Sequence, residues 1–294
     1  MTRVNRPLLI AVDGGGTLCR LAALSGGTRV EVTGGAANVS TDFDGAMATI
    51  RDGLARLSAA AGASAAQMAG AQVYLGLAGV VSADLAARVA AGVPAARVQV
   101  EDDRPAAVLG ALGQADGCVV GLGTGSFLAR HAEGGITLRG GWGLRLGDEA
   151  SGGWLGRALL ARVLHVHDGM AEASPLTRAV LSEFGADPGA LVAFSLRAVP
   201  ADYAAYAPRI LAAARQGDAV AVDLMRAGAD YLTRGLHAIG WRPGEALCLT
   251  GGLGSGYASW LPAGMQAALI PPKGSALDGA LALARRLDEG CDDR

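Results

Sequence analysis

Three glycine-rich turns are the clearest candidates for chemistry in this sequence, because each directly follows a short apolar run. Their sequences are DGGGT at 13–17, GLGTGS at 121–126 and TGGLGSG at 250–256. Glycine lets backbone N–H groups approach an anion without an obstructing Cβ, and neighbouring hydroxyls add donors. Any one of these turns could simply close a hairpin in a chain with 45 glycines. Together they indicate a protein that binds phosphate groups or a nucleotide.

The two most familiar nucleotide-binding motifs do not account for these turns. The single lysine, Lys273, does not belong to a GxxxxGK[ST] loop, and no GxGxxG segment lies between a strand and a helix. The sequence therefore argues against P-loop and Rossmann-type binding.

Carboxylates at the ends of two predicted strands could supply further chemistry. Asp13 closes the apolar run at 8–12, and an acidic triplet at 101–103 closes the run at 98–100. Adjacent side chains on a strand point to opposite faces, so only one of Asp102 and Asp103 can face a substrate. The other interpretation of the triplet is a solvated, acidic strand end.

Composition excludes membrane-spanning proteins. The hydrophobic fraction is 51% and mean hydropathy is +0.32, yet no uncharged apolar run reaches the ~18 residues of a spanning helix. Arg3 and Arg6 precede an apolar run that Asp13 ends after about six residues, so a signal peptide is not expected. We expect a cytoplasmic protein without a membrane partner.

Charge and cysteine usage narrow the class further. Net charge is −2 and the arginines are spread thinly, a pattern that does not favour nucleic-acid binding. Cys19, Cys118, Cys248 and Cys291 are far apart and form no CxxC pair. This spacing argues against a disulfide framework, a zinc site or an iron–sulfur cluster held within one chain. We expect small buried hydrophobes, with Cys291 a tail residue.

Alternating strand and helix patterns must position these residues. The first part predicts a three-stranded meander, from apolar runs at 8–12, 21–24 and 30–32. An amphipathic helix follows, in which Phe43, Met47, Ile50, Leu54 and Leu57 recur at helical spacing. Its expected caps are Ser40 or Thr41 at the start and Gly62 at the end. A strand at 73–77, a helix at 83–91, a strand at 98–100 and a helix at 105–112 complete this half.

The same plan restarts near residue 113. A strand at 118–122 leads into the second glycine-rich turn, and strand-like pieces through Leu128 and at 136–138 follow it. The predicted helices span 155–166, 175–184, 203–215 and 220–237, before a strand at 247–250 and a helix at 275–287. This duplication predicts an α/β protein with domains at 1–112 and 113–294. The last helix, about 276–290, could pack back on the first domain.

In this order the motifs resemble those of the BadF/BadG/BcrA/BcrD ATPase family. They are DGGGT, a strand ending in Asp103, GTGS, the segment GGWGLRLGDEASGGWLGR at 140–157, and TGGLGS. Within the family the chain is most similar to N-acetylglucosamine and glucosamine kinases. The resemblance implies the fold of the actin, hexokinase and Hsp70 superfamily, with two ribonuclease H-like (actin-like ATPase) domains and a central cleft. It also implies ATP-dependent phosphorylation of an amino sugar at its 6-hydroxyl, Mg²⁺ as cofactor, and a homodimer.

The resemblance assigns roles to individual positions. Asp13 would hold hydrated Mg²⁺, and Asp103 would be the catalytic base. The residues that would contact ATP are Gly14, Gly15, Gly16, Thr17, Gly123, Thr124, Gly125, Ser126, Gly251, Gly252 and Ser255. The residues that would contact the sugar are Asn38, Asp103, Thr124, Gly141, Trp142, Gly143 and Asp148. Glu149 is expected to cap the helix that Ser151 begins, and Trp154 to lie in the core.

Three other functions share this fold. An ATPase activator of an acyl-CoA reductase or dehydratase needs paired cluster cysteines near the second phosphate loop, and Cys118 has no partner there. A non-catalytic sugar sensor would not need Asp13, Asp103 and both loops. A filament protein would not need Asn38 or the segment at 140–157. The sequence leaves open whether the sugar is N-acetylated, carries a free amine or is another hexose derivative.

Overall fold

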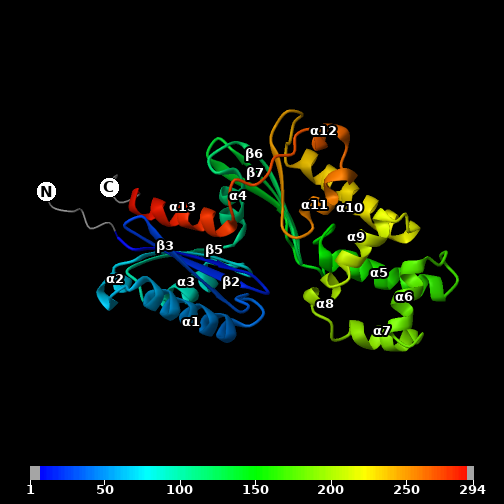
Figure 1. Cartoon of the computed structure of the whole chain (residues 1–294), viewed down its shortest axis with the longest axis horizontal. Helices are drawn as coiled ribbons and strands as arrows, with labels where there is room; N and C mark the ends of the chain where they lie inside the picture. The colour runs from blue at the N-terminus through cyan, green and yellow to red at the C-terminus, as the bar shows by residue number, and fades with distance from the viewer. Residues whose placement is uncertain (1–6, 290–294) are drawn as a thin grey trace. The chain divides into compact units, whose positions relative to one another are not determined.

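The computed structural model describes residues 7–289, which form two α/β units (Figure 1). The first unit runs to Gln114 and resumes at Lys273, and the second spans Ala115–Pro272. The C-terminal helix α13 (Ala276–Glu289) therefore belongs to the first unit.

The sheet of the first unit is built around the meander that the sequence predicts. Its strands are β1 (Leu9–Gly14), β2 (Cys19–Ser25), β3 (Thr28–Gly34), β4 (Gln72–Leu77) and β5 (Arg97–Glu101). The order is β3-β2-β1-β4-β5. Strands β1 to β3 pair antiparallel, whereas β4 and β5 run parallel to β1. The carboxyl ends of β1, β4 and β5 consequently meet at one edge of the sheet.

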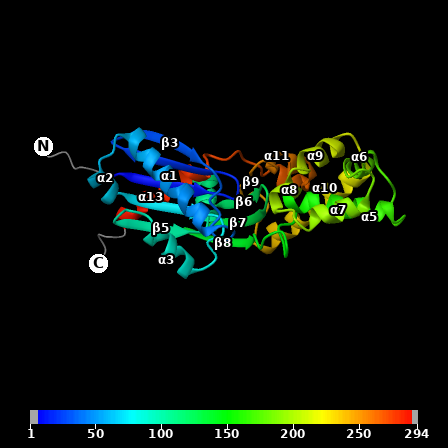
Figure 2. The same ribbon diagram turned by 90° about the horizontal axis from the view of Figure 1, so that it is seen from below.

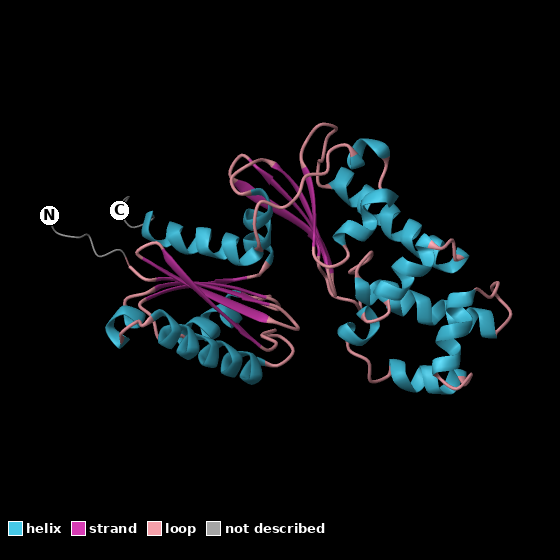
Figure 3. Cartoon of the chain, viewed as in Figure 1, coloured by secondary structure: helices cyan, strands magenta, loops and turns pink. Residues whose placement is uncertain are grey.

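Helices cover both faces of this sheet (Figure 3). Helices α1 (Phe43–Ala61), α2 (Ala65–Ala69) and α3 (Ala83–Ala91) pack on the face that carries Ile10 and Val12. Helices α4 (Arg104–Leu112) and α13 pack on the face that carries Ala11 and Tyr74. Alternation along each strand thus gives the unit two separate hydrophobic cores.

The predicted amphipathic helix is α1, although it begins differently from the prediction. The side chain of Asp42, not of Ser40 or Thr41, caps it by accepting a hydrogen bond from the N–H of Gly45 at 2.9 Å. Gly62 ends the helix in the left-handed conformation, as predicted, with φ 61°. Because Asp42 caps the helix, Ser40 and Thr41 can donate hydrogen bonds to another residue, Asn38.

The second unit repeats the strand order of the first (Figure 2). Strands β6 (Gly117–Leu122), β7 (Ser126–Ala132), β8 (Gly135–Gly140) and β9 (Leu247–Thr250) are arranged as β8-β7-β6-β9. The place of a fifth strand is taken by an extended segment that forms a single parallel bridge, Leu247 with Leu269. The duplication predicted from the sequence is therefore present in the sheets.

Helices form most of the second unit. They are α5 (Gly152–His167), α6 (Pro175–Glu183), α7 (Pro188–Ser195), α8 (Pro200–Ala204), α9 (Ala207–Arg215), α10 (Ala219–Ala238), α11 (Gly254–Tyr257), the 3₁₀ turn η1 (Ala258–Trp260) and α12 (Ala263–Gln266). The single helix predicted at 203–215 was wrong, because the region forms two helices: α8 starts at Pro200, and α9 starts at Ala207 with Pro208 as its second residue. Helix α7 was missed because its continuous apolar run lacks helical periodicity. Within residues 7–289, no helix has the length and apolarity that crossing a bilayer requires.

Candidate active site

The first glycine-rich turn joins β1 to β2. Strand β1 extends to Gly14, two residues beyond the predicted run, so Asp13 lies within the strand. A Cβ on Gly14 would lie 2.5 Å from Cδ2 of Leu77 and 3.1 Å from Cβ of Ala37, so a larger residue would require these neighbours to shift. The N–H of Gly15 donates to the carbonyl of Leu18 at 2.9 Å and closes the turn. Gly14 and Gly15 therefore shape the turn.

Gly16 and Thr17 form the tip of this turn and are exposed. In the described part of the chain, no acceptor pairs with the backbone N–H of either residue. A Cβ on Gly16 would meet nothing within 4 Å, so the space above the turn is open. Two adjacent free N–H groups and a hydroxyl make this tip suited to bind an anion.

Asp13 carries an ion pair with Arg20, which lies directly opposite it on β2. Nη2 of Arg20 is 2.6 Å and Nε is 3.1 Å from the same carboxylate oxygen, Oδ2. The side chain of Asp13 is 13% exposed, and among the described residues Oδ1 has no hydrogen-bond partner. Mg²⁺ typically binds one or two carboxylates while keeping waters and phosphates as its other ligands. The donor set at Asp13 fits such an ion.

The acidic triplet leaves the strand after its first residue, so Asp102 and Asp103 do not continue the strand as predicted. Strand β5 ends at Glu101, whose carboxylate accepts a hydrogen bond of 2.5 Å from the hydroxyl of Tyr74. Asp102 pairs with the guanidinium of Arg104 and also accepts from the backbone N–H of Arg104 at 3.0 Å. Asp103 stands at the N-cap position of α4, but its carboxylate makes no capping hydrogen bond. The turn, not strand alternation, thus decides which carboxylate is available.

Asp103 is the carboxylate of this edge whose acidity is strongly altered. Burial, and then the negative charges of Asp102 and Asp13, raise the pKa of Asp103 to about 7. Its Cα would lie 3.4 Å from a Cβ on Gly76, so this glycine of β4 leaves room for the carboxylate turn. Gly76 was missed in the sequence because a lone glycine inside a strand gives no functional signal.

Asn38 lies at the same edge and has a fixed amide orientation. Its Oδ1 accepts hydrogen bonds from the N–H of Ser40 at 3.0 Å, the hydroxyl of Ser40 at 2.9 Å and the N–H of Thr41 at 3.3 Å. Gly79, at φ 86°, lies beside this oxygen, because a Cβ there would be 2.4 Å from it. Three donors on Oδ1 leave the Nδ2 amide as the group that Asn38 can offer to a ligand.

The second glycine-rich turn connects β6 to β7 and is held by the start of α5. The carbonyls of Gly123 and Thr124 accept hydrogen bonds from the N–H groups of Gly152 at 2.8 Å and Gly153 at 3.1 Å. The hydroxyl of Ser126 donates to the carbonyl of Glu149 at 2.6 Å. Within the described chain, the N–H groups of Thr124 and Gly125 have no acceptor. This turn therefore offers a second fixed pair of anion-binding donors.

The segment between β8 and α5 is unusually rich in left-handed backbone. Asp148 has φ 58° and Ala150 has φ 66°, and Gly141 and Gly143 are also positive. The buried carboxylate of Asp148 accepts a hydrogen bond from the N–H of Gly143 at 3.1 Å and lies against Gly125, since a Cβ there would be 2.7 Å from Oδ2. Asp148 thus contacts both this segment and the second glycine-rich turn.

The tryptophans in and after this segment differ in exposure, and Glu149 has a different role from the predicted one. Trp142 is 75% exposed, whereas Trp154 is partly buried against the core, as predicted. The prediction that Glu149 caps α5 was wrong. The hydroxyl of Ser151 caps the helix instead, by accepting a hydrogen bond from the N–H of Trp154 at 3.0 Å.

The third glycine-rich turn follows β9. The N–H of Leu253 donates to the carbonyl of Leu122 at 3.0 Å, and a Cβ on Gly251 would lie 2.3 Å from the same oxygen. This close approach to the backbone explains why glycine occupies position 251. Gly252 and Ser255 are exposed. The turn thus meets the end of β6 beside the second glycine-rich turn.

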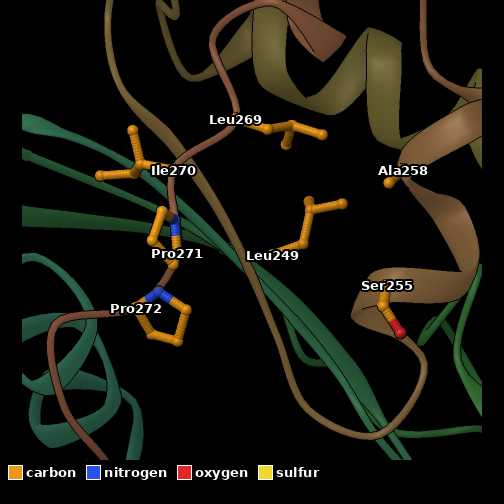
Figure 4. A pocket seen from close by; sticks show the side chains of 7 residues that line it. All are labelled: Leu249, Ser255, Ala258, Leu269, Ile270, Pro271 and Pro272. Carbon is orange, nitrogen blue, oxygen red and sulfur yellow. The ribbon is translucent and has the colours of Figure 1, made fainter.

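A pocket of about 250 Å³ lies next to this turn (Figure 4). It opens where the segment after α12 separates from β9, beyond the Leu247–Leu269 bridge. Its walls are apolar apart from one hydroxyl, and its lining residues are Leu249, Ser255, Ala258, Leu269, Ile270, Pro271 and Pro272. An apolar hollow beside the third glycine-rich turn suits an apolar or aromatic group.

The predicted site residues therefore form one group within each unit. The group on the first unit comprises Asp13, Gly14, Gly15, Gly16, Thr17, Asn38 and Asp103. The group on the second comprises the three segments that end β6, precede α5 and follow β9. Sequence reasoning missed Gly152 and Gly153, although their adjacency at a helix start was a usable signal for close packing.

The cysteines of the described chain are isolated on separate strands. Cys19, Cys118 and Cys248 are buried, and burial raises the pKa of Cys19 and Cys118 to about 12. Cys291 lies outside the described residues. Among residues 7–289, no cluster of three or more His, Cys, Asp or Glu side chains is arranged to hold a metal ion.

Comparison with known sequences places the chain in a family. Residues 10–260 match the BadF/BadG/BcrA/BcrD ATPase family, far more than half of the sequence. The chain belongs to this family. It is also 29% identical to glucosamine kinase GspK of Vibrio cholerae over 278 residues, which cover 94% of this chain and 95% of that protein.

Solved structures resemble this BadF/BadG/BcrA/BcrD family member over almost the whole chain. A proposed N-acetylglucosamine kinase from Chromobacterium violaceum has a TM-score of 0.86 at 36% identity, covering 95% of this chain and 99% of that one. A ROK family glucokinase from Streptomyces griseus, in complex with glucose and AMPPNP, has a TM-score of 0.56 at 22% identity, covering 95% and 99%. The likeness confirms the predicted α/β fold with two actin-like ATPase domains.

Proposed function

We propose that this protein transfers the γ-phosphate of ATP to the 6-hydroxyl of an amino sugar, with Asp103 as general base. The observation that carries this proposal is the carboxylate pair at the edge of the first sheet. Asp103 makes no capping bond and has a pKa raised to about 7, while Asp13 keeps one free oxygen. A base whose pKa is near neutrality can accept a proton at physiological pH and release it afterwards.

The proposed reaction is an in-line displacement at phosphorus. The hydroxyl oxygen of the sugar forms a bond to the γ-phosphorus as the bond to the β,γ-bridging oxygen breaks, and Asp103 accepts the hydroxyl proton. Little covalent chemistry is required of the protein, because most catalysis of phosphoryl transfer comes from positioning and charge stabilisation.

Each unit, taken by itself, offers groups that suit a nucleotide. On the first unit, the N–H groups of Gly16 and Thr17 would donate to phosphate oxygens. On the second, the N–H groups of Thr124 and Gly125 would do the same, and the apolar pocket at Leu249 would receive the adenine ring. Mg²⁺ bound near Asp13 would neutralise charge on the β- and γ-phosphates. The proposal therefore gives Asp13 the role of binding the metal ion and Asp103 the role of accepting the proton of the sugar hydroxyl, both at the same edge of the first sheet.

The acceptor sugar would be recognised by a few fixed polar groups. Asn38 offers Nδ2 as a donor, and Asp103 accepts from the reacting hydroxyl. Asp148 has a buried carboxylate that can accept from sugar hydroxyls, and the exposed ring of Trp142 is available for an apolar sugar face. The names of the Vibrio cholerae and Chromobacterium violaceum proteins support an amino sugar as the substrate class.

A coupled assay of ADP release tests this function. Purified protein with Mg-ATP would be given N-acetylglucosamine, glucosamine, glucose, N-acetylmannosamine or N-acetylmuramic acid in turn. We expect one amino sugar to stimulate ADP release well above the others, and the phosphate to be found on its 6-oxygen by NMR. ADP release that no sugar stimulates, from protein that binds ATP, would contradict the proposal.

A further inference from the structure

The ion pair between Arg20 and Asp13 lies where the proposed function requires a metal ion. The two residues face each other across β1 and β2, and both Nε and Nη2 of Arg20 approach Oδ2. The side chain of Arg20 is 42% exposed and that of Asp13 is 13% exposed. A pair with such an exposed arginine is weakly held, so it can be exchanged for another partner.

Neither Arg104 nor Lys273 is placed to replace Arg20 at this edge. Arg104 is engaged by Asp102. Lys273, the single lysine of the chain, lies against Gly113 at the opposite end of α4 from Asp103, ~15 Å away by the helical rise. Arg20 is also one hairpin turn away from Gly16 and Thr17, whose free N–H groups form the anion-binding tip.

We propose that Arg20 exchanges partners when Mg-ATP binds, leaving the carboxylate of Asp13 and donating to a phosphate oxygen of the nucleotide. This inference rests on the proposed function, which takes Asp13 as the carboxylate that faces Mg²⁺. A dication and a guanidinium held on one small carboxylate repel each other, and the side chain of Arg20, which is 42% exposed, has solvent to move into. Phosphate is the preferred new partner because the planar guanidinium matches two of its oxygens at once.

Under this proposal the role of Arg20 differs between the free protein and the nucleotide complex. In the free protein, Arg20 neutralises Asp13 next to Asp102 and Asp103, so it competes with Mg²⁺ for that carboxylate. In the complex, Arg20 supplies positive charge to the phosphates. Removing the guanidinium must therefore ease Mg²⁺ binding and weaken phosphate binding, a combination that a merely structural ion pair does not produce.

Isothermal titration calorimetry of wild type, Arg20→Met and Arg20→Lys tests this exchange without turnover. The ligands are AMPPNP at saturating Mg²⁺, AMPPNP across a range of Mg²⁺ concentrations, and adenosine. For Arg20→Met we expect about tenfold weaker AMPPNP binding at saturating Mg²⁺, unchanged adenosine binding and a Mg²⁺ half-saturation several-fold lower than wild type. Arg20→Lys keeps a point charge and should recover part of the AMPPNP affinity.

Arg56→Met is the matched control, because Arg56 forms an exposed pair with Asp52 on α1 and has no role in the proposal. It should bind all ligands as wild type does. Unchanged Mg²⁺ dependence and unchanged AMPPNP affinity in both Arg20 variants would overturn the exchange. Wild type that binds AMPPNP but phosphorylates no sugar would contradict the proposed function while leaving this result valid, whereas wild type that binds no nucleotide would overturn both.

Discussion

Replacing Asp103 by Asn should strongly reduce turnover and at the same time stabilise the protein at alkaline pH. The carboxylate is forced into a buried site beside Asp102 and Asp13, and these surroundings raise its pKa from 3.8 to about 7. Between these two values the folded protein binds more protons than the unfolded chain, so stability falls as pH rises. Asparagine has the same shape without the charge and removes this cost.

The size of the effect follows from the displacement of the pKa. A change from 3.8 to about 7 corresponds to at most about 4 kcal/mol above pH 7, at 1.36 kcal/mol per pH unit. Asp103 is partly exposed, and solvent screening reduces the figure to roughly 2 kcal/mol. The gain should be near zero at pH 4 and complete above pH 7. A free-energy change of this size raises Tm by roughly 4–8 °C.

The assay is thermal unfolding of wild type and Asp103→Asn at pH 5 and pH 8, with kinetics on the same samples. Asp52→Asn, in the exposed pair with Arg56, is the control and should gain no stability. Turnover of Asp103→Asn should drop by about 10² to 10⁴, with binding of sugar and ATP largely kept. The reasoning is refuted if the variant loses stability at pH 8, or if it differs from wild type equally at both pH values.

Three further substitutions test other parts of the structure. Asp102→Asn removes a negative charge and frees Arg104, so the pKa of Asp103 should fall. The acid limb of the kcat/KM profile should then move down by about one pH unit. A limb that does not move would show that another group titrates. Gly153→Ala places a Cβ 2.9 Å from the carbonyl oxygen of Thr124 and should lower kcat/KM for ATP by about tenfold, whereas Gly264→Ala, in open space, should leave it unchanged. Equal effects of the two alanines would argue against loop distortion. Tyr257→Phe removes a buried hydroxyl that has no hydrogen-bond partner among the described residues. In denaturant titration it should raise the free energy of unfolding by about 1 kcal/mol. A loss of stability would show that the hydroxyl does make a hydrogen bond.

The local pattern of the sequence determined much of the fold. Helix α1, its Gly62 cap, both meanders and the duplicated strand order follow from apolar periodicity and turn residues, which act within a few residues of each other. The three glycine-rich turns and Asp13 could also be identified, because the order of the motifs is itself a sequence property.

Tertiary structure alone decided what these residues can do. No sequence rule shows that Asp103 leaves the strand, that burial and Asp102 raise its pKa, or that Arg20 lies on Asp13 across two strands. Likewise, the amide direction of Asn38 depends on Ser40 and Thr41 being released by the Asp42 cap. Electrostatics and hydrogen bonding depend on distances between atoms, and those distances are fixed only when the chain has folded.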